Sequence, residues 1–179
     1  MTDESIMEAV KNGDLQKASL LFERHHKRIF NFLAQLADDR ELAADLTQNV
    51  FLRMIRYRGS FRQDSRFTPW IYQIARNVFA DHYQMVKKKH LQTVDIDNVG
   101  DNLPDESESA VMEENEALLH RSMALLTDEQ RELLILTRFQ HMKYEEVAQI
   151  METTVSNIKV KVHRAIGKLR EHYFALAKT

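Results

Sequence analysis

The stretch DLTQNVFLRMIRYRGSFRQDSRFTPWIYQIARN, residues 45–77, carries the strongest indications of fold and function in this chain. Its first half predicts an amphipathic helix, because apolar residues recur at helical spacing at Leu46, Val50 and Met54. The Gly-Ser pair at 59–60 ends that helix, and a polar loop follows. Thr68 is then expected to cap a second helix that has Pro69 in its first position. The stretch therefore predicts two helices joined by a polar loop.

Arginines and aromatic residues alternate through this stretch. They are Arg53, Arg56, Arg58, Arg62, Arg66 and Arg76, with Tyr57, Phe61, Phe67, Trp70 and Tyr72 between them. Cations neutralise phosphates and aromatic faces stack on unpaired bases, so one interpretation is a surface for single-stranded nucleic acid. The other interpretation is a helix pair whose aromatics form the core and whose arginines are solvated. The stretch alone leaves both open.

The composition of the whole chain favours an all-α protein. Its 179 residues include four glycines, two prolines and no cysteine, and strand-like alternation is hard to find. The absence of cysteine excludes disulfides and thiolate metal sites. The acidic N-terminus has no signal-like apolar core, and no apolar run approaches membrane-spanning length, so we expect a cytoplasmic protein with no membrane insertion.

Nothing in the sequence indicates an enzyme, a cofactor or a metal site. The eight histidines lack metal-ligand spacing, and there is neither a Gly-rich phosphate loop nor a nucleophile elbow. One Glu-x-x-His pair, at 23 and 26, matches half of a di-iron motif of helical bundles. Such sites need a second copy, which is missing, so we interpret the pair as chance.

Charge is unevenly distributed along the chain. Residues 1–94 carry 15 Lys and Arg against 11 Asp and Glu, residues 95–117 carry none against nine, and residues 118–179 carry ten against seven. Two basic bodies joined by an acidic tether point toward nucleic acid. We expect a domain at 1–90, a flexible acidic linker at 91–109 and a domain at 110–179. The linker is either a solvated spacer or a mimic of nucleic acid.

Helical periodicity and capping signals divide the N-terminal half into four predicted helices. These cover 3–11, 15–37, 38–58 and about 69–88. Asp14 is the expected N-cap of the second helix. Asp38 is the expected N-cap of the third, with Glu41 three residues later completing a capping box.

The C-terminal half predicts a helix-turn-helix unit. A helical pattern runs from 110, and Thr127 with Gln130 forms a capping box for a helix that extends to Phe139. A short helix at 144–151, a turn at 152–154 and a last helix at 155–174 complete the pattern. The last helix carries DNA-reading residue types, at Ser156, Asn157, Lys159, Lys161, His163, Arg164, Lys168 and Arg170. We favour duplex DNA binding over a plain αα-hairpin with a basic face.

Both halves together resemble the extracytoplasmic-function (group IV) sigma factors of bacterial RNA polymerase, from about Ala18 to Tyr173. The N-terminal resemblance rests on residues 44–52, Phe61, residues 67–71 and residues 74–77. The C-terminal resemblance rests on Leu126-Thr127, Tyr144-Glu145-Glu146-Val147-Ala148, His163-Arg164-Ala165 and Leu169-Arg170. The resemblance implies two helical domains, similar to sigma region 2 and sigma region 4, and a protein that directs core polymerase to promoters, melts the −10 region and starts transcription.

The resemblance also implies a role for each surface. Docking on the polymerase β′ clamp coiled coil is expected of Asp45, Gln48, Asn49, Leu52 and Arg53. Recognition and melting of the −10 element is expected of Arg58, Phe61, Arg62, Gln63, Asp64, Ser65, Arg66, Trp70, Gln73, Arg76 and Asn77, with one base flipped into a pocket beside the loop. Recognition of the −35 element is expected of Ser156, Asn157, Lys159, Val160, Lys161, His163 and Arg164. The helices near that reader are expected to touch the β flap, the linker to run toward the RNA exit path, and an anti-sigma factor to be a possible partner.

This chain departs from the family pattern at the predicted reading helix. Glu152 stands where the family often has Gly, and a left-handed backbone there would be costly for Glu, so we expect the turn to differ from the family's. Ser156-Asn157-Ile158 and Val160-Lys161 replace the common Gly-Thr-Val and Ser-Arg. The −35 sequence therefore cannot be inferred.

Two other classes compete with a sigma factor. An ordinary helix-turn-helix regulator would bind duplex DNA through 144–170 without polymerase, but it has no use for the Arg and aromatic residues of 45–77. A pure protein-interaction module would have no DNA affinity, even with polymerase present.

Overall fold

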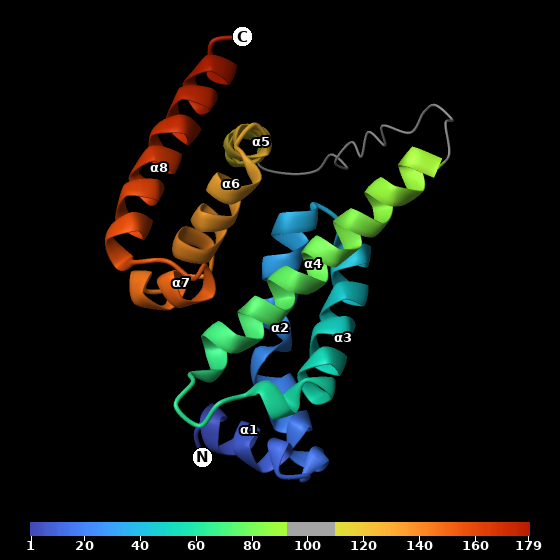
Figure 1. Cartoon of the computed structure of the whole chain (residues 1–179). Coiled ribbons are helices and arrows are strands. Elements are labelled where there is room, and N and C mark those ends of the chain that lie inside the picture. The colour runs from blue at the N-terminus through green and yellow to red at the C-terminus, as the bar shows by residue number, and fades with distance from the viewer. Residues whose placement is uncertain (93–109) are drawn as a thin grey trace.

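The computed structural model describes residues 1–92 and 110–179, with side chains for 1–92 and 112–179 (Figure 1). All regular structure in these residues is helical, which confirms the all-α prediction. The helices are α1 (Asp3–Lys11), α2 (Ala18–Ala37), α3 (Arg40–Arg56), α4 (Phe67–Gln92), α5 (Ala110–Ala124), α6 (Asp128–Leu134), α7 (Tyr144–Ile150) and α8 (Val155–Ala177). Single turns of other helix types are η1 (Leu15–Lys17), η2 (Arg58–Ser60) and η3 (Ile135–Phe139).

The N-terminal body consists of α2, α3 and α4, with α1 below them in Figure 1. The α2–α3 turn differs from its prediction by one residue. Asp38 ends α2 in the left-handed conformation with φ of 52°, and Asp39 caps α3 by accepting a 3.0 Å hydrogen bond from the Leu42 N–H. Asp38 is therefore not the cap, because its backbone forms the turn that reverses the chain. Asp14 also makes no side-chain cap, and a 3₁₀ turn precedes α2.

The aromatic residues of the opening stretch divide between the two interpretations. Phe61, Phe67 and Tyr72 are fully buried among the large core side chains, as the packing interpretation requires. Arg62 and Arg66 are exposed in the loop, and Trp70 is only partly buried. The core therefore accounts for some of the rings, while the loop cations and Trp70 remain accessible to a ligand.

Helix α4 begins at Phe67, so the prediction that Thr68 caps this helix is wrong. The first N–H of the helix instead donates to Glu4 Oε1 of α1, at 3.0 Å. The helix also extends to Gln92, four residues past its predicted end, so the first two residues of the predicted linker are helical. The remainder of that linker, and its expected path, lies outside the described residues.

The C-terminal body is a helix-turn-helix supported by α5 and α6. The Thr127–Gln130 capping box of α6 is confirmed. Buried Ile150, Ile158 and Val162 fill the angle between α7 and α8.

The replacement of the family's glycine by Glu152 suggests a different turn between α7 and α8, but Glu152 adopts the left-handed conformation with φ of 54°. The backbone thus keeps this turn without the family's glycine. We infer that the packing of α7 on α8 offsets the local strain of a non-glycine residue.

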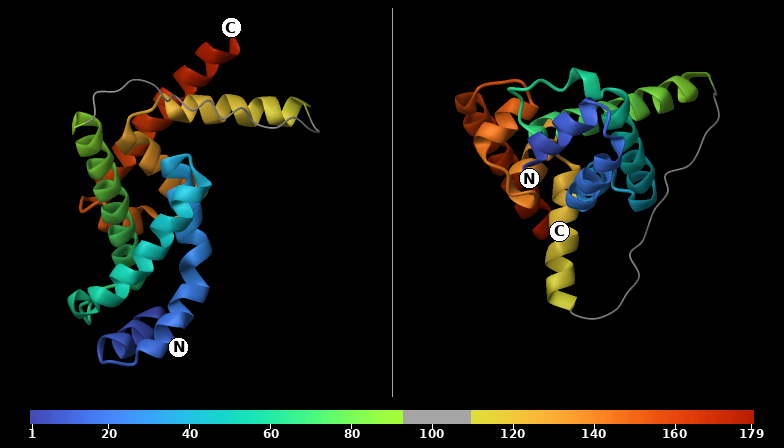
Figure 2. Two further views of the ribbon diagram at one scale, coloured as in Figure 1. Left: turned by 90° about the vertical axis from the view of Figure 1, so that its right-hand side faces the viewer. Right: turned by 90° about the horizontal axis from the view of Figure 1, so that it is seen from below.

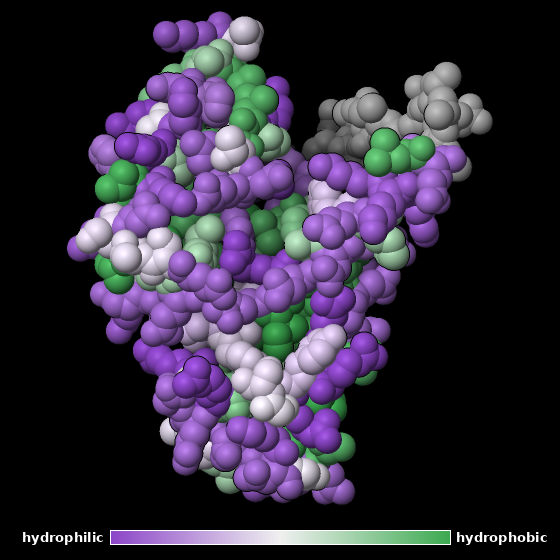
Figure 3. All heavy atoms as spheres, in the orientation of Figure 1, coloured by the Kyte–Doolittle hydropathy of each residue, from purple (hydrophilic) through white to green (hydrophobic). Residues whose placement is uncertain are grey.

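The two bodies pack against each other through α4 and α7, and the views of Figure 2 agree on this contact. Figure 3 shows a largely hydrophilic face, with apolar atoms visible in the recess between the bodies. We call this packed arrangement of the two bodies the closed form. It determines which of the predicted site residues are accessible to solvent.

Candidate nucleic-acid interface

The first turns of α8 present an exposed polar row. Thr154 caps the helix by accepting from the Asn157 N–H at 3.1 Å, and the Asn157 side-chain amide donates to Thr153 Oγ1 at 2.8 Å. The residues exposed on this face are Ser156, Asn157, Lys159, Val160, His163 and Arg164. Opposite them, Ile158, Val162 and Ala165 are buried, so the core sets the orientation of the row.

Lys161 differs from its neighbours on α8. It is partly buried and forms an ion pair with Glu129 of α6. Its charge is therefore already neutralised within the domain, and it is less available to a phosphate than Lys159.

The loop between α3 and α4 exposes Arg62, Gln63, Asp64 and Arg66, with Ser65 partly buried. A hollow of about 250 Å³ opens between this loop and α4. It is lined by Asp64, Arg66, Pro69, Trp70, Gln73 and, from α7, Gln149. This volume and the partly buried indole face suit a single planar ring.

Two of the residues expected to contact the −10 element, Phe61 and Arg58, have structural roles in the N-terminal body. Phe61 is only 1 % exposed and packs edge-on against Trp70, with ring centroids 5.2 Å apart. Arg58 donates to the Ile55 carbonyl at 2.9 Å. Phe61 therefore supports Trp70 from the core, and its expected DNA contact is corrected to a packing role.

The C-terminal body covers part of the predicted −10 face on α4. Arg76 pairs with Glu132 of α6 and also donates to the Ile150 carbonyl at 3.1 Å. Gln73 Nε2 donates to the Gln149 carbonyl at 2.9 Å. Both side chains are therefore engaged within the chain, while Asn77 beside them is exposed.

A second set of contacts joins the bodies at Gln140. The Tyr72 hydroxyl donates to Gln140 Oε1 at 2.7 Å, and Arg28 donates to the Gln140 carbonyl at 3.2 Å. Burial raises the pKa of Tyr72 to about 12, so its hydroxyl remains a proton donor at neutral pH.

The polymerase-docking residues expected on α3 share one exposed surface. They are Asp45, Gln48, Asn49 and Leu52, and Leu52 is an apolar side chain that is 66 % exposed. Arg53 at the edge is partly buried and pairs with Asp81 of α4 at 2.6 Å. The expected docking residues Asp45, Gln48, Asn49 and Leu52 therefore form one open face of α3, with Leu52 as its apolar member.

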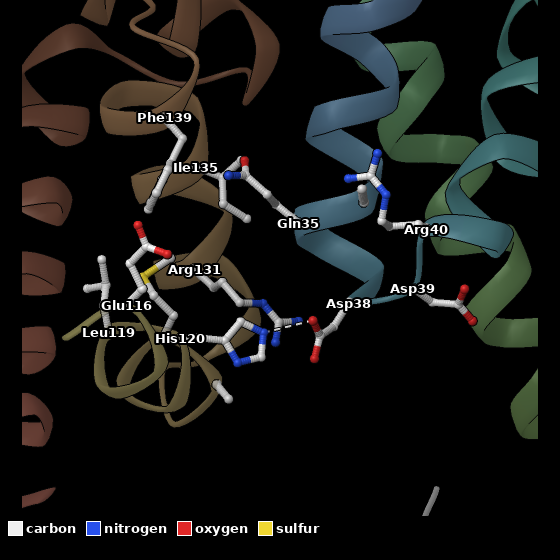
Figure 4. Close-up of a pocket in the computed structure, with 13 residues that line it drawn as sticks. Gln35, Asp38, Asp39, Arg40, Glu116, Leu119, His120, Arg131, Ile135 and Phe139 are labelled. Atoms are coloured by element: carbon white, nitrogen blue, oxygen red, sulfur yellow. Dashed lines mark hydrogen bonds and ion pairs between the residues drawn. The ribbon is translucent and has the colours of Figure 1, made fainter. Parts of the chain in front are cut away.

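A larger hollow of about 510 Å³ lies between the bodies, where α2 meets α5 and α6 (Figure 4). Figure 4 shows Arg131 and His120 on one side of it and Asp38 on the other, and His120 Nε2 lies 2.8 Å from Asp38 Oδ1, within hydrogen-bonding distance. This hollow exists only while the two bodies are packed together.

Two further properties concern the described part of the chain. No cluster of metal-binding side chains occurs there. None of its helices is both long and apolar enough to cross a bilayer.

An open basic loop on one body and a capped reading helix on the other define a two-domain helical DNA-binding protein. Residues 21–88 match Sigma-70 region 2, and residues 116–169 match Sigma-70 region 4. The chain is 31 % identical over 160 residues to the ECF RNA polymerase sigma factor SigX of Bacillus subtilis, covering 86 % of this chain and 81 % of that protein.

Two other comparisons agree. The RNA polymerase sigma-H factor of Pseudomonas aeruginosa is 26 % identical over 172 residues, covering 91 % of this chain and 89 % of that protein. The sigma factor RpoE of Bartonella quintana, solved with the anti-sigma factor NepR, has a similar fold. Its TM-score is 0.67 at 22 % identity, covering 86 % of this chain and 94 % of that chain.

This chain belongs to the extracytoplasmic-function sigma factors. It is an RNA polymerase sigma factor, and its partners are core polymerase and promoter DNA.

Several residues that shape the site were not predicted from the sequence. Glu132, Gln140 and Gln149 cover the α4 face, while Glu4 and Lys11 of α1 reach the ends of the basic loop. Their partners are 50 or more residues away in the chain. Periodicity and capping rules act over a few residues and contain no signal for such pairs.

Proposed function

We propose that residues 1–90 recognise and melt the −10 element and dock on polymerase, while residues 110–179 recognise the −35 element. The observation that carries this proposal is the pairing of an open basic loop beside Trp70 with the exposed polar row on α8. The acidic residues 91–109 connect them.

The start of α8 reads duplex DNA in the major groove. Its polar row stands on a buried face, so the side chains are held at fixed spacing. The reading residues are Ser156, Asn157, Lys159, Val160, His163 and Arg164. Lys161 joins them only when it leaves Glu129.

The loop at 62–66 and α4 bind the non-template strand of the −10 element. Extruding one base costs a few kcal/mol, which stacking and hydrogen bonds in the pocket offset. The hollow beside Trp70 receives that base, and Arg62 and Arg66 neutralise the adjacent phosphates. Gln73, Arg76 and Asn77 extend the contact along α4. Phe61 packs against Trp70 from the core side, and Arg58 supports the chain that leads into the loop.

Asp45, Gln48, Asn49, Leu52 and Arg53 dock on the β′ clamp coiled coil, and the C-terminal helices touch the β flap. Each DNA-binding half is small, so the free protein binds promoters weakly. Polymerase fixes the spacing of the two halves and converts two weak contacts into one tight contact.

The two bodies must separate before the surface of α4 that carries Gln73 and Arg76 can bind the −10 element. Arg76 and Gln73 are bonded to α6 and α7, and Gln149 forms one wall of the base pocket. Polymerase binding therefore has to separate the two bodies, and the free energy of the Arg76–Glu132 contact opposes that step.

Replacing Glu132 with glutamine is expected to increase the population of the open form. Losing one charge of this partly buried pair costs about 1–2 kcal/mol, which is about 5- to 30-fold in the closing equilibrium. Because the chain has no cysteine, dyes can be attached to cysteines introduced at exposed Met85 and Phe174. Single-molecule energy transfer between the dyes then reports the separation of the bodies.

The matched control for this experiment is Glu129→Gln. Glu129 is also on α6 and also forms an ion pair with a basic side chain, but its partner Lys161 lies in the same body. Unchanged energy transfer in Glu132→Gln, or equal opening in the two variants, would show that the Arg76–Glu132 pair does not hold the bodies together.

We also propose that an anti-sigma factor regulates this protein in the cytoplasm. The similar sigma factor of Bartonella quintana was solved with such a partner. A protein that bound across the two bodies would stabilise the closed form and keep the −10 face covered.

The test of the proposed function is in vitro transcription with purified bacterial core polymerase on a fragment library of the source genome. Discrete new start sites that share two spaced elements are expected only when this protein is added. If the protein alone shifts duplex DNA but core polymerase gains no initiation, the helix-turn-helix regulator is the better assignment.

A further inference from the structure

The base-reading loop is fixed at both ends by the same short helix, α1. Lys11 Nζ donates to the Phe61 carbonyl at 2.7 Å, immediately before the loop. The Phe67 N–H, immediately after it, donates to Glu4 Oε1 at 3.0 Å. Both contacts are partly buried, and both cross at least 50 residues of sequence.

Helix α1 is itself firmly attached to the N-terminal body. Ile6, Met7 and Val10 are fully buried against the core. Asp3 accepts hydrogen bonds of 2.7 Å from both Arg24 and His25 of α2. Although burial opposes it, these two partners lower the pKa of Asp3, so the carboxylate stays charged at neutral pH. Lys11 and Glu4 therefore extend from a rigid support.

The loop has little internal structure of its own. Within it, the Ser65 N–H donates to the Arg62 carbonyl at 3.0 Å. Arg62 and Asp64 form an exposed pair at 3.4 Å, and such pairs contribute little in water. The position of the loop over the hollow is thus set mainly at its two ends.

The chemistry of the two anchors suits the atoms that they hold. The Phe67 N–H lies at the start of α4 and has no hydrogen-bond acceptor within the helix, so the Glu4 carboxylate supplies one. The negative carboxylate also interacts favourably with the positive end of the helix dipole. A lysine ammonium gives the Phe61 carbonyl a charge-assisted hydrogen bond. Phe61 and Phe67, whose backbones are held, are also the rings that pack against Trp70.

We propose that Lys11 and Glu4 are positioning residues for base recognition, holding the loop at 62–66 and Trp70 in the geometry that accepts the flipped −10 base. This inference rests on the proposed role of that loop. It assigns a specificity function to α1, which precedes the part of the chain that matches Sigma-70 region 2.

The experiment compares Lys11→Met, Glu4→Gln and wild-type protein in complex with core polymerase. Open-complex formation is measured on a cognate promoter and on the same promoter with each −10 base substituted. Each variant is expected to open the cognate promoter about 3- to 10-fold more slowly and to discriminate less between cognate and substituted bases. Binding to core polymerase is expected to remain within about twofold, because the α3 surface is untouched.

Two control variants, Lys17→Met and Asp3→Asn, and one rescue variant, Lys11→Arg, separate positioning of the loop from general loosening of α1. Lys17→Met removes the same charge from the same region. In the described part of the chain, the ion-pair partner of Lys17 is the nearby Asp14, at 3.5 Å, and not the loop. Asp3→Asn weakens the attachment of α1 without touching either end of the loop. Lys11→Arg keeps the charged donor and is expected to restore discrimination.

The outcomes are distinct. Normal discrimination in both Lys11→Met and Glu4→Gln would overturn the inference, as would equal loss in Asp3→Asn, which would indicate a purely structural role. If wild-type protein itself supports no promoter-dependent opening, the proposed function fails instead.

Discussion

Replacing Trp70 with alanine is expected to slow open-complex formation about 5- to 150-fold while leaving polymerase binding within about twofold. Stacking of one base on an aromatic side chain contributes about 1–3 kcal/mol, and every 1.4 kcal/mol is about tenfold. Trp70 is the aromatic side chain in the lining of the hollow beside the loop. The measurement is promoter opening by the reconstituted holoenzyme, followed by permanganate reactivity of unpaired thymines.

The Trp70 experiment needs a control for folding, because the indole also packs on Phe61 and Phe67, with ring centroids 5.2 and 6.2 Å away. Trp70→Phe keeps an aromatic face and is expected to retain most of the opening. Circular-dichroism melts establish that both variants are folded. A folded alanine variant that opens promoters at the wild-type rate would remove Trp70 from the base pocket.

Replacing Arg164 with alanine is expected to weaken promoter binding about 5- to 150-fold and to reduce discrimination at one −35 position. A lost bidentate base contact costs about 1–3 kcal/mol. Arg164 is exposed on the open face of α8, while its neighbour Ala165 is buried in the core. Holoenzyme binding to promoters with single −35 substitutions measures both effects.

Arg164 tests the reading helix more cleanly than Asn157 does. The Asn157 amide also bonds Thr153, so its removal disturbs the turn before α8. Lys168→Ala is the matched control, because Lys168 is a cation farther along α8 that pairs with Glu171 at 2.9 Å. It is expected to weaken binding uniformly across −35 sequences, if at all. Unaltered −35 discrimination in Arg164→Ala would exclude that residue from base reading.

Features that depend on neighbouring residues were predictable from the sequence. The Thr127–Gln130 capping box and the Thr154 cap of α8 each arise from contacts within about four residues. The exposed polar row from Ser156 follows from the helical spacing of residues along α8. Helical periodicity and capping chemistry act over that range, so the fold class and the reading helix could be inferred.

Two of the incorrect predictions arise where a distant residue competes with a local one. Thr68 has the chemistry of an N-cap, yet α4 begins at Phe67, two residues before the predicted start at Pro69, and Glu4 satisfies the Phe67 N–H from 63 residues away. Phe61 has the chemistry of a stacking platform, but it is buried behind Trp70. In both cases the packing of α1 and the core selects one role from two that the residue type allows.

The sequence by itself determined which helices form, which residue types they expose and which family the pattern resembles, because these depend on local spacing and charge. Only the tertiary structure decided that α1 holds both ends of the loop, and that α6 and α7 cover Gln73 and Arg76. Those arrangements join groups 50 or more residues apart. The energy of such contacts depends on how whole helices pack, which no local pattern encodes.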